Sequence, residues 1–251
     1  MITALIDADI LAYQAAAAVE KPIQWDEDLW TLHAFENEAR EKFLDHIIAI
    51  LDKTKADKFT LVFSDSANWR KDVLPTYKAN RSGVRKPILL KAIREESMVT
   101  YPFHLRPTLE GDDLMGIIAT GHHILTGEKI LCSLDKDLKT IPGKHYNFGK
   151  DEFFEITPDE ANYWHMFQTL TGDATDGYSG CPGCGPKTAE KILAQVQPED
   201  YWNAVVKAYD AAGLSQDVAL VQARVAKICQ STDYNFKTKK VKLWNPPVTS
   251  K

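Results

Sequence analysis

Nine carboxylates stand at short turns of this 251-residue sequence, in groupings that could hold metal ions. They are Asp7, Asp65, Glu110, Asp112, Asp113, Asp135, Asp137, Asp173 and Asp176. A single acidic residue before a helix is typical of a helix cap, which needs one acceptor for each helix end. Paired and tripled carboxylates exceed that need, and their repulsion is costly unless a cation neutralises it. Because Mg²⁺ and Mn²⁺ prefer carboxylate oxygens, the set predicts a divalent-metal site.

Two divalent ions about 4 Å apart stabilise the attacking and leaving oxygens of phosphoryl transfer, so this chemistry is the first to consider. Two other metal sites are excluded by spacing. An EF-hand that began at Asp135 would need glycine and glutamate where Thr140 and Tyr146 stand. The H-E-x-x-H motif of zinc proteases does not occur.

The formal net charge of −5 argues against a nucleic-acid partner when it is taken alone. Setting nine of the 35 acidic residues aside leaves 26 against 30 basic ones. The remaining surface is therefore basic, and bound cations would make it more so. This distribution of charge suits a polyanionic substrate.

The stretch "GYSGCPGCGPKTAEKIL", residues 177–193, raises the question of what its C-x-x-C spacing does. Structural zinc needs four ligands, and the other two cysteines, Cys132 and Cys229, are single and distant. A thioredoxin-like motif would place a cysteine at the start of a helix, but Pro186 takes that position. We therefore interpret Cys181 and Cys184 as small buried hydrophobes.

The glycines of the same stretch predict a phosphate site. Gly180, Gly183 and Gly185 leave the backbone bare before a helix, so a phosphate can approach its free N–H groups. Lys187 adds a charge contact. Such a loop holds a sugar-phosphate strand without reading its bases.

The apolar patterns around these residues predict an α/β fold. Three short apolar runs, at 2–6, 58–64 and 129–134, end at Asp7, Asp65 and Asp135. Parallel strands are apolar on both faces, and sites in such sheets form at the carboxyl ends of the strands. Helical patterns separate or follow the runs. They cover residues 29–51, 113–125, 158–170, 186–196, 199–212 and 216–230.

The segment 68–94 is basic and contains Trp69 and Tyr77, which either stack on a base or belong to the core. A run of charges by itself is usually a solvated surface. No run approaches the ~18 apolar residues of a membrane span. Four cysteines do not suggest a disulfide framework, so we expect a reducing cytoplasm.

The segment "GDATDGYSGCPGCGPKTAEKIL" resembles the G-D-x-x-D-N-[IV]-P-G-[IV]-x-G-[IV]-G-P-K-T-A signature of the flap endonuclease and 5′-nuclease family. "LIDAD", "VFSDS…WRKDVLPTYKANR", "EGDDLMG" and "SLDKDL" agree in the same order, so the resemblance runs across about residues 2–195. The free-standing length and the ending "KLWNPP" resemble the small 5′–3′ exonucleases of T-odd phages. The chain departs from the signature at Gly177, Cys181 and Cys184.

The resemblance implies a PIN-like fold, a central mainly parallel sheet flanked by helices, in two regions. Residues 1–157 would form the nuclease core, with a short basic arch at about 68–97. Residues 158–251 would form a helical DNA-binding region, with a helix-hairpin-helix at about 173–197. The implied activity is metal-dependent 5′–3′ exonuclease and flap endonuclease cleavage near the 5′ ends of duplex DNA.

The resemblance also assigns roles to residues. Asp65, Glu110 and Asp112 would hold the first Mg²⁺ or Mn²⁺ ion, with Asp7 and Asp113 ligating directly or through water. The second ion would be held by Asp135, Asp137, Asp173 and Asp176. Lys78 and Arg81 would point at the scissile phosphate. The implied DNA contacts are Arg70, Tyr77, Gly180, Gly183, Gly185, Lys187 and Thr188, and backbone carbonyls of the hairpin would bind K⁺.

The expected partners are duplexes with 5′ ends, nicks or flaps, and RNA/DNA hybrids, bound by a monomer. If the chain is phage-encoded, the compartment is the host cytoplasm. Two other interpretations stay open at this point. One is a PIN-like ribonuclease, and the other is a non-catalytic DNA-binding module of the same fold.

Overall fold

The computed structural model describes residues 1–247 and is built around a six-stranded sheet in the order β5-β4-β1-β6-β7-β8. The strands are β1 (Ile2–Asp7), β4 (Lys58–Val62), β5 (Phe103–His104), β6 (Glu128–Cys132), β7 (Gly143–Asn147) and β8 (Glu152–Ile156). All neighbours pair in parallel except β7 with β8. The three predicted strands and the mainly parallel sheet are confirmed.

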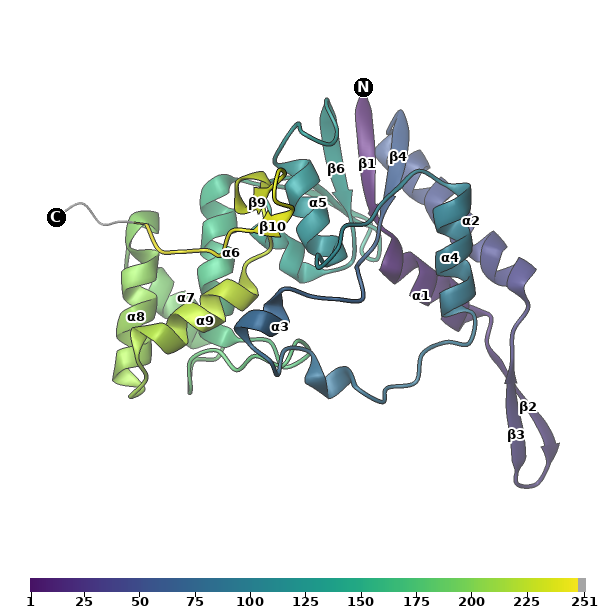
Figure 1. The fold of residues 1–251 in the computed structure, drawn as a ribbon, viewed down its shortest axis with the longest axis horizontal. Coiled ribbons are helices and arrows are strands. Elements are labelled where there is room, and N and C mark those ends of the chain that lie inside the picture. Colours follow the sequence, from purple (N-terminus) through teal and green to yellow (C-terminus); the bar gives the residue numbers. More distant parts are fainter. Residues whose placement is uncertain (248–251) are drawn as a thin grey trace.

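The sheet is covered on both faces, which explains the continuous apolar character of its central strands. On β1, Ala4 and Ile6 pack into one core and Leu5 into the other. Helices α1 (Ala8–Ala18), α2 (Glu36–Thr54) and α4 (Leu90–Thr100) cover the first face, and α5 (Gly111–Ala119) covers the second. Figure 1 shows the two sets of helices on either side of β6, β1 and β4.

Two predicted helix boundaries are wrong. Residues 29–33 form β3 (Leu29–His33), which pairs with β2 (Lys21–Asp26) in a hairpin that projects from the body (Figure 1). The helix predicted over 113–125 ends at Ala119. Gly121 follows the end of the helix and packs closely against Ser231. A Cβ at this glycine would lie 2.6 Å from Cβ of Ser231, so the contact leaves no room for a larger residue.

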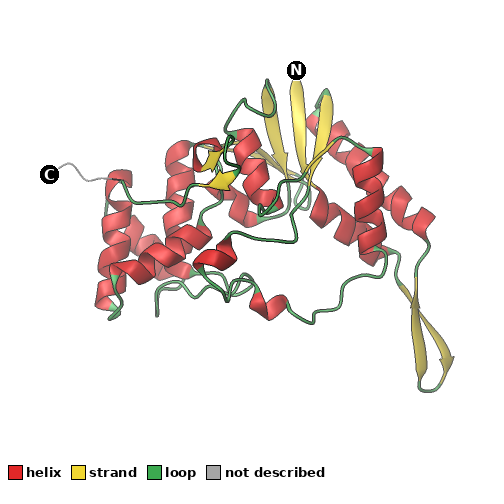
Figure 2. Cartoon of the chain, in the orientation of Figure 1, coloured by secondary structure: helices red, strands yellow, loops and turns green. Residues whose placement is uncertain are grey.

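The chain after residue 157 forms the four predicted helices. They are α6 (Pro158–Thr171), α7 (Pro186–Leu193), α8 (Tyr201–Ala211) and α9 (Gln216–Ala226). They enclose a separate apolar cluster that includes Cys181 and Cys184, confirming that the sulfurs are buried hydrophobes. Figure 2 shows this helical group beside the sheet. Residues 248–251 of the predicted second region lie outside the described residues.

The end of the chain returns to the core region. After α9, Ile228, Cys229 and Tyr234 pack into the same cluster as α5. The short strands β9 (Tyr234–Asn235) and β10 (Lys240–Val241) follow. The helical group is thus joined to the sheet by packing at both of its ends. No helix within residues 1–247 has the length and apolar character that a membrane crossing requires.

Candidate active site

The centre of the site is Asp7, which ends β1 and begins α1. Its Oδ1 accepts the Ile10 amide at 3.4 Å and its Oδ2 accepts the Ser133 hydroxyl at 2.8 Å. Burial, together with the nearby charges of Asp9 and Asp135, raises the pKa of Asp7 to about 7 against the opposing hydrogen bonds from Ser133 and Ile10. The strand end therefore holds a carboxyl whose ionisation is only partly compensated by these two hydrogen bonds.

Asp112 lies on the first turn of α5 and faces the same place. Burial raises its pKa well above the usual range, with further contributions from Asp135, Asp7 and Glu110. Among residues 1–247 its carboxylate has no hydrogen-bond or ion-pair partner, although the charge of Lys78 partly lowers its pKa. Asp112 is only partly buried, so water also reaches it, and a cation would stabilise its ionised form.

Asp135 and Asp137 come from the turn after β6, which continues as a 3₁₀ helix (Lys136–Thr140). Asp135 Oδ1 accepts the Asp137 amide at 2.8 Å, and Gln168 Nε2 of α6 donates to Asp137 Oδ1 at 2.6 Å. Burial raises the pKa of both carboxyls, that of Asp137 to about 7, and Asp135 adds to the shift of Asp137.

Asp173 and Asp176 belong to the loop between α6 and α7. Asp173 Oδ1 accepts the amides of Thr175 and Asp176 at 2.7 and 3.2 Å. Lys136 Nζ lies 3.3 Å from Asp173 Oδ2. Burial opposes ionisation of Asp173, but these amides and Lys136 outweigh it and lower its pKa.

Lys78 and Arg81 reach this loop from the basic segment. The Lys78 amide donates to Asp176 O at 2.8 Å, and its ammonium pairs with Glu110 and lies 3.5 Å from Asp176 Oδ2. Arg81 Nη2 lies 2.6 Å from Asp176 Oδ1. Burial opposes the charge on Lys78, yet Glu110 and Asp176 outweigh it and raise its pKa. The two predicted catalytic cations therefore stand beside the carboxylates.

Arg70 and Tyr77 are not DNA contacts, and that expectation is wrong. Both side chains are 2% exposed. The Tyr77 hydroxyl lies 3.0 Å from Glu110 Oε2 and 2.7 Å from Asp176 Oδ2. Arg70 Nη1 lies 2.7 Å from Asp113 Oδ2 and 3.0 Å from Glu110 Oε2. Trp69 is buried with them, so both aromatic residues of the segment belong to the core.

Asp113 is engaged on all sides and is not available as a ligand, which corrects its predicted role. Arg70 binds both of its oxygens, and the Trp69 indole N–H and the Cys229 amide donate at 2.9 and 3.0 Å. Burial opposes its ionisation, but Arg70 outweighs burial and holds the pKa low. Its function is to fix Arg70, which also donates to the carbonyl of Val225.

Asp65 follows β4, and its Oδ2 accepts the Thr108 amide at 2.8 Å. This contact ties the carboxylate to the loop before α5. The structure thus groups seven of the nine predicted carboxylates. They are Asp7, Glu110, Asp112, Asp135, Asp137, Asp173 and Asp176.

The glycine-rich loop is only partly as predicted. Gly180 is buried, and its amide donates to Gln222 Oε1 at 2.9 Å, so its predicted contact with DNA is wrong. A Cβ there would lie 2.3 Å from the Gly172 nitrogen, so this glycine serves close packing. Gly183 and Gly185 have open space where a Cβ would stand. Together with Lys187 and Thr188 they are exposed at the start of α7.

The seven carboxylates fit a divalent cation by their chemistry, since all donors are oxygens and burial, with the repulsion among them, raises several pKa values. In residues 1–247, no three His, Cys, Asp or Glu side chains are arranged so that they could together hold one ion. Instead most of these carboxylates have a protein partner of their own, such as Ser133, Gln168 or Lys78. Metal binding would therefore exchange these contacts for the ion.

Several residues that position the site escaped the sequence analysis. Ser133 is the first residue of "SLDKDL", but the motif gave no reason to assign it a role. Gln168 stands outside every motif. Asn80 donates to the carbonyls of Ala174 and Thr175 at 2.9 and 3.3 Å and so fastens the basic segment to the acidic loop. Only its place between Lys78 and Arg81 could have pointed to Asn80. Its partners are backbone carbonyls, which any residue type carries, so the sequence does not reveal them.

Comparison with known proteins identifies the fold and the family. Residues 3–162 match the family model of the 5′–3′ exonuclease N-terminal resolvase-like domain. The exodeoxyribonuclease of Enterobacteria phage T3 is 32% identical over 96% of this chain and 92% of the relative. The exonuclease of Escherichia phage T7 is also 32% identical, over 96% of this chain and 93% of the relative.

A structural comparison agrees at the level of the fold. The D15 flap endonuclease of bacteriophage T5, solved in a complex with DNA and metal ions, superimposes with a TM-score of 0.69 at 15% identity. The match covers 92% of this chain and 90% of that one. The acidic edge of the sheet, the length of the family match and the two phage relatives together show that this chain belongs to the 5′–3′ exonuclease family of DNA nucleases.

Proposed function

We propose that this protein is a divalent-metal-dependent 5′–3′ exonuclease that also cleaves flaps, acting near the 5′ ends of duplex DNA and of RNA/DNA hybrids. The observation that carries the proposal is the group of seven carboxylates with Lys78 among them. A non-catalytic module would gain nothing from keeping such repulsion. The phage relatives, an exodeoxyribonuclease and an exonuclease, support a DNA substrate.

Two Mg²⁺ or Mn²⁺ ions would supply Lewis-acid stabilisation of the phosphoryl oxygens. Glu110 and Asp112 are the residues suited to the first, with Asp7 as a direct or water-mediated ligand. Asp65 would join them by giving up its hydrogen bond from the Thr108 amide. Asp135, Asp137, Asp173 and Asp176 are suited to the second. Asp113 is left out of the set, because Arg70 already occupies its carboxylate.

The chain's own cations supply the remaining stabilisation. Once the carboxylates are neutralised, the ammonium of Lys78 and the guanidinium of Arg81 are free to donate to the scissile phosphate. A donor directed at charge that grows in the transition state typically contributes ~10²–10³ in rate. Both residues are held near their target by the turn at 78–81, which Asn80 fastens to the acidic loop.

Binding of the duplex is assigned to the start of α7. Gly183, Gly185, Lys187 and Thr188 are exposed there, and the open space at both glycines admits a phosphate close to the backbone. A K⁺ ion bound by carbonyls of the same loop is part of this proposal. The related D15 protein, which shares the fold, was solved with DNA and metal ions.

The protein is proposed to act as a monomer in the cytoplasm, which is that of the host if a phage encodes it. The test uses a 5′-labelled linear duplex, a covalently closed circle, an RNA/DNA hybrid and a single-stranded RNA, each with Mg²⁺ or with EDTA. Degradation of the linear duplex and the hybrid in Mg²⁺ alone is expected. Full activity in EDTA, rapid cleavage of the closed circle, or a preference for the RNA would contradict the proposal.

A further inference from the structure

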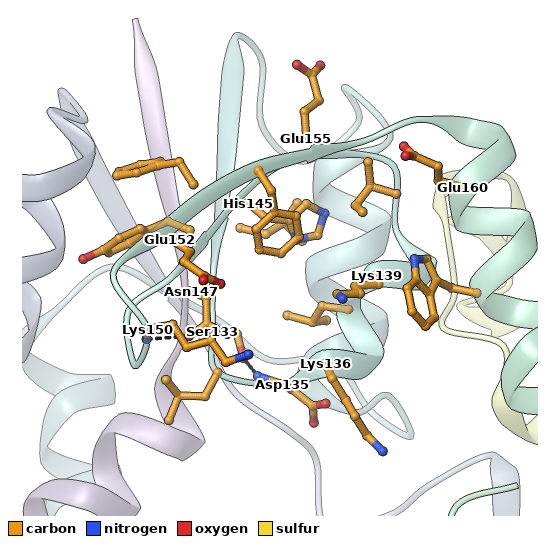
Figure 3. Close-up of a pocket in the computed structure, with 18 residues that line it drawn as sticks. Ser133, Asp135, Lys136, Lys139, His145, Asn147, Lys150, Glu152, Glu155 and Glu160 are labelled. Carbon is orange, nitrogen blue, oxygen red and sulfur yellow. Dashed lines mark hydrogen bonds between the residues drawn. The ribbon is translucent and has the colours of Figure 1, made fainter. Parts of the chain in front are cut away.

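A cavity of about 730 Å³ opens beside the carboxylates, and no residue of the basic segment lines it. It lies between the β7–β8 hairpin, the 3₁₀ helix after β6 and the beginning of α6 (Figure 3). Ser133 and Asp135 form part of its wall. The cavity is therefore continuous with the site, and its other lining residues take no part in the proposed reaction.

Three lysines line this cavity, of which Lys139 and Lys150 come from different elements. Lys150 extends into it from the turn between β7 and β8, and Lys139 lies on the 3₁₀ helix (Figure 3). The ammonium of Lys139 stands 4.5 Å from the centre of the Trp164 ring. Within residues 1–247, neither lysine has a carboxylate within 4 Å, unlike Lys136, which pairs with Asp173. The cavity thus offers two cations that are not neutralised.

The acidic residues around the cavity do not cancel these charges. Glu155 points away from it (Figure 3). Glu160 is turned to the start of α6, where its Oε2 accepts the Thr157 amide at 2.8 Å. Asp135 belongs to the metal site. Glu152 is the one remaining acid of the lining, so two cations face one anion there.

The same cavity carries aromatic surface. Phe154 stacks on His145 with 5.0 Å between the ring centres, and Phe153 stacks on Tyr146 at 4.5 Å. Phe153 and Phe154 are neighbours on β8 and point to opposite faces of the hairpin, so the ring on the side of Lys139 is that of Phe154, which is partly exposed. Bases stack on such rings without regard to sequence. Cations and aromatic rings side by side are the combination that a nucleotide requires.

We propose that this cavity binds a nucleotide 5′-monophosphate, with the phosphate between Lys139 and Lys150 and the base against the aromatic wall. The volume falls within the range of small-ligand pockets. The inference rests on the proposed function and deepens it, because 5′–3′ degradation presents this group in two forms. One is the 5′-terminal nucleotide of the strand, and the other is the released mononucleotide.

The first experiment measures binding of dAMP by isothermal titration calorimetry in EDTA, so that no metal ion contributes. We expect saturable binding by the wild type, at least tenfold weaker binding of deoxyadenosine, and at least tenfold weaker binding of dAMP by Lys139→Gln and by Lys150→Gln. Lys144→Gln is the matched control, because Lys144 lies on β7 but pairs with the exposed Glu128. Absence of saturable dAMP binding, or equal affinity in all variants, overturns the proposal.

The second experiment separates the two sources of the nucleotide. Initial rates on linear duplexes with a 5′-phosphate or a 5′-hydroxyl are compared in Mg²⁺ for the wild type and Lys150→Gln. A wild-type preference for the phosphate that Lys150→Gln loses assigns the cavity to the strand end. Equal rates with retained dAMP binding assign it to the product. A wild type that degrades DNA in Mg²⁺ but binds no dAMP would overturn this inference and leave the proposed nuclease function standing.

Discussion

The ammonium group of Lys78 forms an ion pair with Glu110, the residue before the first turn of α5. It also lies 3.5 Å from Asp176 Oδ2, and its positive charge lowers the pKa values of Asp112 and Asp135, which other contributions raise. One lysine therefore partly neutralises carboxylates from three different loops. Its backbone is fixed in a left-handed conformation with φ 55° by the hydrogen bond to Asp176 O. Lys78 is thus the internal counter-ion of the site.

The first prediction is that Lys78→Met slows cleavage more than it weakens substrate binding. The charge stands among the reacting groups, so its loss removes stabilisation of the transition state, by about 10²–10³ in rate. Single-turnover kinetics at saturating enzyme measure the chemical step, and duplex affinity is measured in Ca²⁺. An unchanged rate with weaker affinity would make Lys78 a contact for ground-state binding only.

The second prediction is that the same variant binds divalent cations more tightly than the wild type. An ion that enters must compete with the Lys78 ammonium for Glu110 and Asp176, and the variant lacks this competitor. Calorimetric titration with Mn²⁺ in the absence of DNA gives the affinity. Lys91→Met is the control, because Lys91 is exposed and faces only Glu95. Weaker or equal Mn²⁺ affinity in Lys78→Met would contradict the assignment of Lys78 as counter-ion.

The third prediction separates the roles of Asp135 and Asp113, two acids that the sequence motifs alone would both assign to the metal site. Asp135→Asn is expected to abolish most activity and to leave the fold stable, since it removes a charge that burial disfavours. Asp113→Asn is expected to destabilise the fold by about 3–5 kcal/mol, because it leaves Arg70 buried without its ion partner. Urea unfolding measures both. Equal stabilities of the two variants would contradict the role given to Asp113.

The fourth prediction concerns the glycine-rich loop. Cys181→Val combined with Cys184→Ile is expected to keep most of the activity, at a cost of about 1–3 kcal/mol for overfilling the core. Gly183→Val is expected to weaken duplex binding, because the side chain would occupy the open space before α7 and adds strain at φ 73°. Duplex affinity in Ca²⁺ and cleavage in Mg²⁺ are measured for both. Abolished cleavage in a well-folded double cysteine variant would show that the sulfurs matter.

The sequence predicted the parts of this site that local patterns determine. Asp7 and Asp135 could be placed because each follows an apolar strand, and parallel strands bring their carboxyl ends to one edge. The role of Asp113 could not be predicted, because Arg70 lies 43 residues away in sequence and only the fold joins them. Gly180 was misassigned for a similar reason. Its environment comes from Gln222 and Gly172, and its own motif does not show that it is buried.

The hairpin at 21–33 shows the limit of periodicity. Leu29 and Leu32 fit the apolar spacing of the helix that follows them, so the pattern extended the helix too far. In the structure both side chains are exposed, at 55% and 41%. Apolar periodicity predicts a helix only where the apolar face is buried, and burial of this segment is not visible in the sequence.

The last prediction is that Mg²⁺ stabilises the protein more as the pH rises from about 4 to about 7. In the folded metal-free protein the pKa values of Asp7 and Asp137 are raised to about 7. The unfolded chain ionises these groups first, so the free energy of unfolding in EDTA loses their contribution as the pH rises through this range. A bound cation favours the ionised forms and reverses the loss, so the increase in melting temperature caused by Mg²⁺ is expected to be small near pH 5 and large near pH 7.5.

His165, whose pKa burial lowers to about 3, also makes stability depend on pH, but it acts equally with and without the metal and cancels in the difference. Thermal melts in Mg²⁺ and in EDTA at each pH measure the effect, and Asp7→Asn plus Asp137→Asn is the variant that should reduce it. Asp112 and Asp135, whose pKa values are also raised, supply the part that remains. A Mg²⁺ effect that is constant across the range, or that is undiminished in the double variant, would show that Asp7 and Asp137 do not sense the ion.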